Sequence, residues 1–151
     1  MNDKLINYFK NVCIETGKLS TCACKQVGCI LVKDKRIIVC GYNGVSSGLK
    51  HCNRIFDKEI ILYNNDERKR HHEWSLLNES HAEQNMFSFC AKEGIKTNNT
   101  ILFVTLSPCI NCAKLIFSAG IKEVYYIEEY DLDKAGLKFL LDNNVKLIQL
   151  K

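Results

Sequence analysis

Apolar positions follow two different periods along the first third of the chain. Between residues 3 and 17 they keep a helical spacing that ends at a glycine. The segments VGCILVK (residues 27–33) and RIIVCGYN (residues 36–43) are instead rich in β-branched residues, as strands are. Only Asp34 and Lys35 separate these two segments. The pattern therefore predicts an N-terminal helix followed by a β-hairpin.

Residues 44–72 interrupt the pattern with glycines, paired serines and the charged run DERKRHH. We expect an irregular insertion there, because insertions of this length are more often functional than idle. The regular pattern then returns as a helix over 79–93, a strand over 100–106, a helix opened by Pro108, a strand over 123–128, a helix over 132–143 and a strand over 145–150. Strands that alternate with helices after a hairpin indicate an α/β protein with a mixed sheet covered on both faces.

Length and composition fit a single domain over residues 1–151. The 151 residues are 46% hydrophobic and 25% charged, which suffices for a core. The net charge of +4 favours a phosphorylated ligand but is too small and scattered for a nucleic-acid groove. The apolar runs are too short to span a bilayer, and the N-terminus lacks the features of a secretory signal. We therefore expect a cytoplasmic protein that binds neither nucleic acid nor membranes.

Nine cysteines are many for a chain of this size. In a reducing compartment cysteines stay as thiols or bind metal. The sequence therefore favours metal ligands together with buried thiols. Four cysteines fall on apolar faces of the predicted helices and strands, which indicates a packing role for Cys13, Cys29, Cys40 and Cys90.

Two short motifs carry the candidate chemistry. His81-Ala82-Glu83 lies at the start of one predicted helix, and PCINC (residues 108–112) lies at the start of another. Cysteines three residues apart on a first helical turn present their sulfur atoms on one side, and the helix dipole favours the thiolates that a metal requires. Cys109, Cys112 and His81 thus supply three zinc ligands. A site with three protein ligands keeps one position open for water.

Glu83 is the candidate proton carrier beside that water. Zinc can bring the pKa of a bound water to about 7, and a carboxylate next to it can transfer the proton. An H-x-E motif combined with P-C-x-x-C is typical of zinc-dependent nucleobase deaminases. The alternative interpretation is a structural zinc site with Glu83 as a surface charge.

Three segments, HHEWSLLNESHAEQN, VTLSPCINCAKLIFSAGIKEVYY and VGCILVKDKRIIVCGYNG, resemble the deoxycytidylate deaminases of the cytidine deaminase superfamily, in particular the phage and bacterial type. The resemblance extends from Thr21 to Asp131. It implies a three-layer α/β/α fold with a mixed five-stranded sheet and the hydrolysis of dCMP to dUMP and ammonia, which supplies dUMP for thymidylate synthesis. It also implies a homohexamer that dCTP, with Mg²⁺, activates and dTTP inhibits.

The resemblance assigns the catalytic zinc ligands and the proton shuttle to the motif residues already described. It also implies substrate contacts. Asn43 matches an asparagine that holds the deoxyribose, Tyr130 an aromatic residue near the pyrimidine, and Lys25 a basic residue that is a candidate for the phosphate. Each has a simpler alternative, namely a turn residue, a core residue and a solvated lysine.

Four further residues match, in order, the ligands of an additional structural zinc in the phage-type enzymes: Cys22, Cys52, His71 and Glu79. Two thiolates, an imidazole and a carboxylate make a closed tetrahedral set, which would hold an insertion too polar to fold alone. His51 or His72 could replace the histidine, and Cys24 could replace the first cysteine. The alternative is free thiols beside a solvated charged segment.

A regulatory nucleotide site is the last feature that the resemblance implies, at Gly41, Tyr42, Gly44 and Lys92. Ser46 stands where the GYNG-x-P-x-G loop of the family has a proline, and Lys92 stands where phage relatives have an arginine. Lysine keeps the charge but loses the planar fork of arginine. These departures concern the strength of the dCTP and dTTP response, not catalysis.

Two other classes of function remain open. A tRNA adenosine deaminase or a free cytosine deaminase would use the same zinc chemistry, but a tRNA reader should carry a basic stripe, and the C-terminal LLDNNVKLIQLK is short and nearly neutral. A zinc-binding regulatory module without turnover would not need Glu83 beside an open coordination position. Ammonia release from dCMP distinguishes the three.

Overall fold

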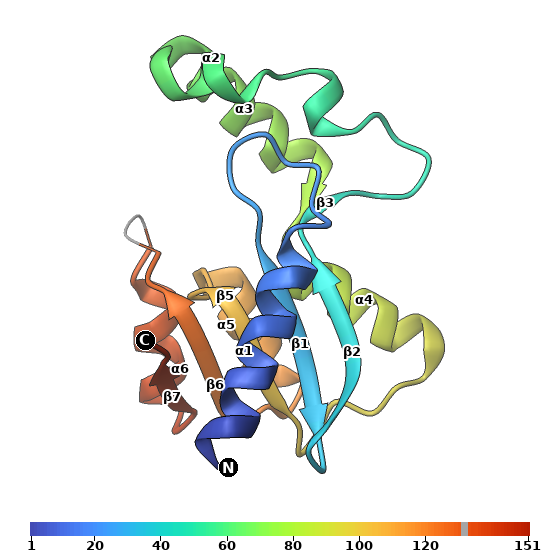
Figure 1. Cartoon of the computed structure of the whole chain (residues 1–151), viewed down its shortest axis with the longest axis vertical. Helices are drawn as coiled ribbons and strands as arrows, with labels where there is room; N and C mark the ends of the chain where they lie inside the picture. The colour runs from blue at the N-terminus through green and yellow to red at the C-terminus, as the bar shows by residue number, and fades with distance from the viewer. Residues whose placement is uncertain (131–132) are drawn as a thin grey trace.

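The computed structural model describes residues 1–130 and 133–151, and it is built around one five-stranded sheet (Figure 1). The strands are β1 (Gly28–Lys33), β2 (Arg36–Tyr42), β5 (Ile101–Leu106), β6 (Glu123–Glu128) and β7 (Lys146–Gln149). They are ordered β2-β1-β5-β6-β7 across the sheet. β1 is antiparallel to β2 and β5, whereas β5, β6 and β7 run parallel. The mixed five-stranded sheet is confirmed.

The predicted hairpin joins β1 to β2. Asp34 and Lys35 both have positive φ angles, 48° and 61°, as a two-residue type I′ turn requires. The turn places Lys33 opposite Arg36. β1 then lies between β2 and β5, with helices over both faces of the sheet, so its residues are buried almost throughout.

Helices cover both faces of the sheet. α1 (Asp3–Gly17) lies on one face, in front of the sheet in Figure 1, and packs Phe9 and Cys13 against Phe103. The other face carries α4 (Ala82–Glu93), α5 (Ile110–Ser118) and α6 (Ala135–Asp142). This is the expected three-layer α/β/α arrangement. Among the described residues, no helix is long and apolar enough to cross a membrane.

The expectation of an irregular insertion at residues 44–72 is wrong, because much of this segment is helical. The short strands β3 (Gly44–Val45) and β4 (Glu79–Ser80) pair with each other at the base of the segment. Between them in the sequence lie the 3-10 helix η1 (Cys52–Arg54), α2 (Lys58–Tyr63) and α3 (Asn65–Asn78). Side chains of Asp57 and Asn64 cap α2 and α3. Phe56, Ile61 and Trp74 form a separate small core. The insertion stands above one end of the sheet, in green at the top of Figure 1.

Some element boundaries also differ from the expected ones. α4 begins only at Ala82, because the residues before it pair with β3. α5 begins at Ile110 with Cys109 as its N-cap, so Pro108 precedes the cap and does not open the helix. α6 begins at Ala135, and the expected start at residue 132 lies outside the described residues.

The predicted packing role holds for three of the four cysteines. Cys13, Cys29 and Cys90 are buried between helices and the sheet. Cys40 is exposed, so its predicted burial is wrong. β2 is an edge strand of the sheet, and the neighbouring elements leave part of its surface open.

Candidate active site

The three predicted ligands of a catalytic metal meet at two helix N-termini. His81 is the N-cap of α4, Cys109 is the N-cap of α5, and Cys112 lies in the first turn of α5. The Nδ1 atom of His81 lies 3.5 Å from each of the two sulfur atoms, and the three ligand atoms lie within 4.8 Å of one another. Tetrahedral zinc with a nitrogen and a sulfur ligand holds them about 3.6 Å apart. The residues therefore fit a zinc ion.

Sheet topology explains why motifs far apart in sequence meet here. β2 and β5 are both antiparallel to β1, so their carboxyl ends lie at the same end of the strands, which is the edge of the sheet meant here. α5 follows β5 directly, and α4 packs on β2 at Gly41, where an added Cβ would lie 2.7 Å from the carbonyl oxygen of Ala82. Both helices thus begin at one edge, which brings their N-terminal residues together.

Glu83 lies in the first turn of α4 beside these ligands. Its side chain is buried, at 4% exposure. Burial raises the pKa of this carboxyl group above its ordinary value, and the nearby imidazole of His81 opposes that effect. The position fits the predicted proton carrier, because a buried carboxyl group next to a metal centre can hold or release a proton.

The contact between Cys109 and Cys112 shifts the pKa values of their thiols in opposite directions. A hydrogen bond with the thiol of Cys112 lowers the pKa of Cys109 below its ordinary value, and the hydrogen bond with His81 acts in the same direction. The contact between the two thiols raises the pKa of Cys112 in turn. The lowered pKa favours the thiolate form of Cys109, which is the form that binds a metal.

The predicted ligands of a second metal also converge, where the insertion meets the loop after α1. Cys22, Cys52, His71 and Glu79 place one ligand atom each within 4.8 Å of the others. The sulfur of Cys22 lies 3.6 Å from Nε2 of His71. One oxygen of Glu79, Oε2, accepts a hydrogen bond from the Ser75 hydroxyl at 2.7 Å. The other, Oε1, is buried without a hydrogen-bond partner among the described residues. An orphaned carboxylate oxygen among thiols and an imidazole fits a metal ion.

The substitutes considered for this second set lie elsewhere. Nδ1 of His51 is within 3.0 Å of the Thr21 hydroxyl. His72 and Cys24 are exposed and stand apart from the cluster. The fold therefore brings together the set with Cys22 and His71, which is the set that matches the phage-type enzymes in order.

The predicted substrate contacts surround the same edge of the sheet. Oδ1 of Asn43 accepts a hydrogen bond from the Val27 amide at 2.8 Å, and Nδ2 donates to the Lys25 carbonyl at 2.9 Å. This amide group ties the loop before β1 to the end of β2, and one of its N–H hydrogens remains for a ligand. The ammonium group of Lys25 pairs with Glu128 at 2.7 Å, with both side chains largely exposed.

Tyr130 joins this group through Ser107. The amide of Tyr130 donates to the Ser107 hydroxyl oxygen at 2.7 Å, and the amide of Ser107 donates to the Glu128 carbonyl at 2.8 Å. These bonds connect Tyr130 to the segment that leads into Cys109.

The four predicted regulatory residues do not form one cluster within the chain. Gly41, Tyr42 and Gly44 lie at the end of β2 and the start of β3. The carbonyl of Tyr42 accepts a hydrogen bond from Asn85 of α4 at 2.8 Å. Lys92 is exposed in the last turn of α4, about 15 Å along the helix axis from its first residue.

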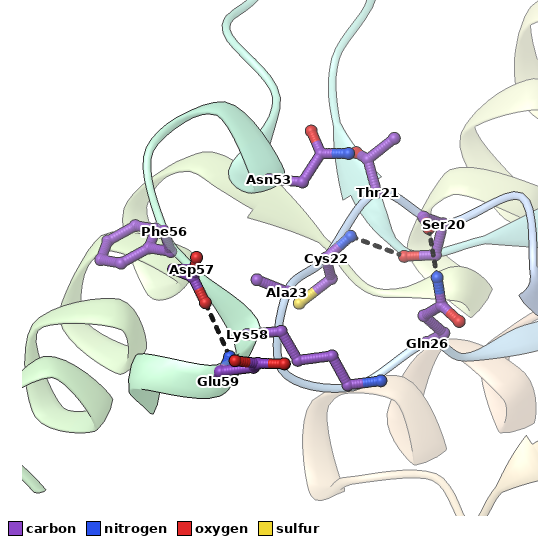
Figure 2. Close-up of a pocket in the computed structure, with 10 residues that line it drawn as sticks. All are labelled: Ser20, Thr21, Cys22, Ala23, Gln26, Asn53, Phe56, Asp57, Lys58 and Glu59. Carbon is purple, nitrogen blue, oxygen red and sulfur yellow. Dashed lines mark hydrogen bonds between the residues drawn. The ribbon is translucent and has the colours of Figure 1, made fainter. Parts of the chain in front are cut away.

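A pocket of about 410 Å³ lies between the loop after α1 and the start of α2, beside Cys22 of the second cluster (Figure 2). The Cys22 amide donates to the Ser20 hydroxyl and the Gln26 side chain to the Ser20 carbonyl, as Figure 2 shows, so the loop is held in place. Asp57, on the opposite wall, caps α2. The residues around the pocket include none of the catalytic ligands or Glu83.

Three residues whose hydrogen bonds support the two sites were not predicted from the sequence. Ser75 stands four positions before Glu79, a helical spacing that could have revealed their contact. Asn85 and Asp133 each contact backbone groups far away in the sequence. Asp133 falls at the start of the helix expected over 132–143, where capping residues are frequent, and only this position could have drawn attention to it.

A His-Cys-Cys cluster with an adjoining glutamate, carried by H-x-E and P-C-x-x-C motifs, is typical of zinc-dependent nucleobase deaminases. Residues 3–128 match the model of the "cytidine and deoxycytidylate deaminase zinc-binding region". The chain therefore belongs to the cytidine and deoxycytidylate deaminase family.

Several known proteins are similar over most of the chain. The deoxycytidylate deaminase of Enterobacteria phage T2 is 35% identical over an alignment of 150 positions that covers 82% of this chain and 80% of the phage protein. ComE operon protein 2 of Bacillus subtilis is 41% identical over 111 residues, or 74% of this chain and 52% of that protein. The crystal structure of the dCMP deaminase from cyanophage S-TIM5 in complex with dCMP and dUMP superposes with a TM-score of 0.80 at 27% identity and covers 99% of both chains.

Proposed function

We propose that this protein is a zinc-dependent deaminase that hydrolyses dCMP to dUMP and ammonia and so supplies dUMP for thymidylate synthesis. The observation that carries the proposal is the convergence of His81, Cys109 and Cys112 beside the buried carboxyl group of Glu83. The choice of dCMP is supported by the likeness to phage deoxycytidylate deaminases, one of which is solved with dCMP and dUMP. A tRNA deaminase structure matches at only 19% identity, a likeness that shows the fold alone.

Glu83 performs the proton transfers of this reaction. A zinc ion held by His81, Cys109 and Cys112 would lower the pKa of a water molecule in its open position and supply a nucleophile at neutral pH. The Glu83 carboxylate accepts a proton from the attacking water and delivers it to N3 of cytosine while the bond from oxygen to C4 forms. It then moves the remaining hydroxyl proton to the 4-amino group. The C4–N bond breaks, and the products are ammonia and the 4-oxo ring of dUMP.

Three residues around the site would hold the nucleotide. The free N–H of the Asn43 amide is available to the deoxyribose, and Tyr130 lies next to the segment that bears the metal ligands, near the pyrimidine. Lys25 would bind the phosphate after exchanging Glu128 for it. Exposed ion pairs of this kind contribute only about 0–1 kcal/mol, so the exchange costs little.

The first experiment replaces Glu83 with alanine. Glu83→Ala should keep its zinc, because the three ligands remain, and should release ammonia from dCMP at least about 10²-fold more slowly than wild type. Glu93→Ala, at the exposed end of the same helix, is the matched control and should behave as wild type. Near-normal turnover by a folded, zinc-loaded Glu83→Ala protein would contradict the assigned role.

We also propose a second, structural zinc ion held by Cys22, Cys52, His71 and Glu79. Their separation and the orphaned oxygen of Glu79 support this site. Metal analysis should find two zinc ions per chain in wild type and one in Cys52→Ala. Cys24→Ala, at an exposed cysteine outside both clusters, should keep both. A single zinc in freshly purified wild type rejects the second site.

Regulation and assembly complete the proposal. We infer that dCTP, with Mg²⁺, activates and dTTP inhibits through Gly41, Tyr42, Gly44 and Lys92, in a homohexamer, as the family resemblance implies. The hydrogen bond between Asn85 of α4 and the carbonyl of Tyr42 supports a link from this loop to the helix that bears the catalytic glutamate. Initial rates against dCMP with each nucleotide, and sedimentation of the purified protein, test both points. A rate unaffected by either nucleotide contradicts the regulation. The cytoplasmic location stays a prediction.

A further inference from the structure

A single carboxylate holds the start of the helix that bears both catalytic cysteines. Oδ2 of Asp133 accepts a hydrogen bond from the amide of Ile110, the first residue of α5, at 2.9 Å. Its other oxygen, Oδ1, accepts one from the amide of Ala135, the first residue of α6, also at 2.9 Å. The side chain of Asp133 therefore joins the N-termini of α5 and α6.

The start of α5 requires an acceptor from outside. The first amides of a helix have no partner within it, and the side chain of the N-cap residue usually accepts from one of them. The N-cap of α5 is Cys109, whose side chain makes no capping hydrogen bond. Its sulfur is directed to His81 at 3.5 Å instead. Because this sulfur serves the metal cluster, the acceptor for the helix comes from Asp133.

Gly136 provides an independent sign that this contact is a close one. An added Cβ at Gly136 would overlap the carbonyl oxygen of Pro108 and would lie 2.8 Å from the carbonyl carbon of Cys109. A side chain at this position would therefore push α6 away from the two residues. Glycine lets the backbone of α6 rest directly on the segment that leads into the metal ligands.

Ser107 holds the other side of the same segment. This serine is 2% exposed, and it bonds to the Tyr130 amide through its hydroxyl and to the Glu128 carbonyl through its own amide. The amide of Asp133 donates in turn to the Tyr130 carbonyl at 3.3 Å. The turn from Ser107 to Ile110 is thus fixed at both ends, by Glu128 and Tyr130 at Ser107 and by Asp133 at Ile110.

We propose that Asp133 is a positioning residue for the catalytic metal centre. By holding the Ile110 amide it sets the first turn of α5, and with it the sulfur atoms of Cys109 and Cys112, relative to His81. This inference rests on the proposed function, since it takes those residues as metal ligands. Groups that orient metal ligands from outside typically change metal affinity or activity by about 10–100-fold when they are replaced.

The decisive variant is Asp133→Asn, which keeps the shape of the side chain. Asparagine has one acceptor oxygen where aspartate has two, so one of the two amides would face an N–H group. Asp142→Asn is the matched control, because Asp142 is the last residue of α6 and its carboxylate pairs, among the described residues, with exposed Lys138. Circular dichroism and thermal unfolding establish that each variant is folded.

The assay follows zinc transfer from the loaded protein to an excess of a coloured chelator. The catalytic phase is the one that parallels the loss of dCMP turnover. In Asp133→Asn this phase should be faster by at least about tenfold, while Asp142→Asn should match wild type. The visible absorption of the cobalt-substituted protein, which reports the geometry of the thiolate ligands, should also change in Asp133→Asn only. A folded Asp133→Asn protein with the wild-type release rate and cobalt spectrum overturns the proposal.

Hydrogen exchange in the zinc-loaded wild type covers the case in which the variant does not fold. The Ile110 amide should exchange as slowly as the Ala113 amide, which is bonded within α5 to the Cys109 carbonyl, although first amides of helices are usually accessible. Rapid exchange at Ile110 alone overturns the proposal. If wild type binds no zinc at this cluster or releases no ammonia, the proposed function fails. If wild type does both and Asp133→Asn is indistinguishable from it, only the role of Asp133 fails.

Discussion

Adding one methyl group at Gly41 should displace the catalytic glutamate without touching it. Gly41 is buried in β2 beneath α4, and a Cβ there would lie 2.7 Å from the carbonyl oxygen of Ala82 and 2.7 Å from the Cβ of Met86. Ordinary van der Waals contacts of a Cβ begin at 3.4 Å, so β2 and α4 must separate by the difference, about 0.7 Å. Because Glu83 follows Ala82 directly, most of this displacement reaches the carboxylate and the neighbouring His81.

Two magnitudes follow for Gly41→Ala. Overpacking of a well-packed core costs about 1–3 kcal/mol of the free energy of unfolding. A misplacement of about 1 Å can cost about 10²-fold in rate, so a displacement of somewhat less should lower kcat for dCMP by about 10- to 100-fold. Urea unfolding measures the first quantity. Ammonia release at saturating dCMP without effector nucleotides measures the second.

Gly120→Ala is the matched control for this variant. Gly120 follows α5 at the end opposite to Cys109 and has a φ angle of 80°, which costs about 1–2 kcal/mol for a residue with a side chain. It should therefore lose stability but keep the wild-type kcat. A Gly41→Ala protein with wild-type stability and turnover would refute the reasoning. Equal losses of turnover in the two variants would show that unfolding, not displacement, is responsible.

Three other measurements address the core, the acid side of the pH range and the insertion. Ile116→Ala should lose about 2–5 kcal/mol because Ile116 is fully buried in α5, whereas Leu115→Ala, at 41% exposure in the same helix, should cost less than about 0.5 kcal/mol; equal effects in urea unfolding would contradict this account of the core. Partial burial opposes ionisation of Glu123, yet the hydrogen bond from Tyr125 and the ammonium group of Lys146 lower its pKa. Its contribution to stability is therefore present above the pKa of the unfolded chain and is lost as the pH falls through the folded value, so Glu123→Gln should cost stability near neutral pH and much less in acid; a difference from wild type that does not vary with pH would argue against it. Removal of metal by a chelator should speed hydrogen exchange in α2 and α3 before it does so in the sheet strands, and uniform acceleration would contradict a structural ion in the insertion.

The sheet and the convergence of His81, Cys109 and Cys112 could be predicted because their signals are local. The β-branched runs, the two-residue turn at Asp34 and Lys35, and the strand-to-helix order determine the sheet. The H-x-E and P-C-x-x-C motifs then fall at two helix starts, and the parallel course of β2 and β5 brings those starts together.

The insertion was misjudged because its helices do not follow an apolar stripe. α3 reads NDERKRHHEWSLLN and buries only His71, so its pattern resembles a solvated loop. Its stabilisation comes from the Asn64 cap, the pairing of Glu67 with Arg70, and the contacts of Phe56 with the face of the helix. Such contacts depend on a folded neighbour, which the sequence pattern does not reveal.

The role of Asp133 could not be derived from the sequence for a related reason. Its carboxylate reaches an amide 23 positions earlier in the chain, and that contact exists only once α5 and α6 lie side by side. The same holds for Glu79, which a helical pattern includes in α4 but which pairs as part of β4 with Val45. Long-range pairing overrides local preference at both positions.

The short connection from β4 to α4 links the two metal clusters directly along the chain. Glu79 belongs to one cluster and His81 to the other, with Ser80 alone between them, and Ser80 is paired to Gly44. A metal ion in the insertion cluster would anchor Glu79 at one end of this tripeptide and so restrict the position of the His81 imidazole at the other end. We therefore expect loading to be ordered in time, with the insertion filled first and the reactive centre maturing afterwards.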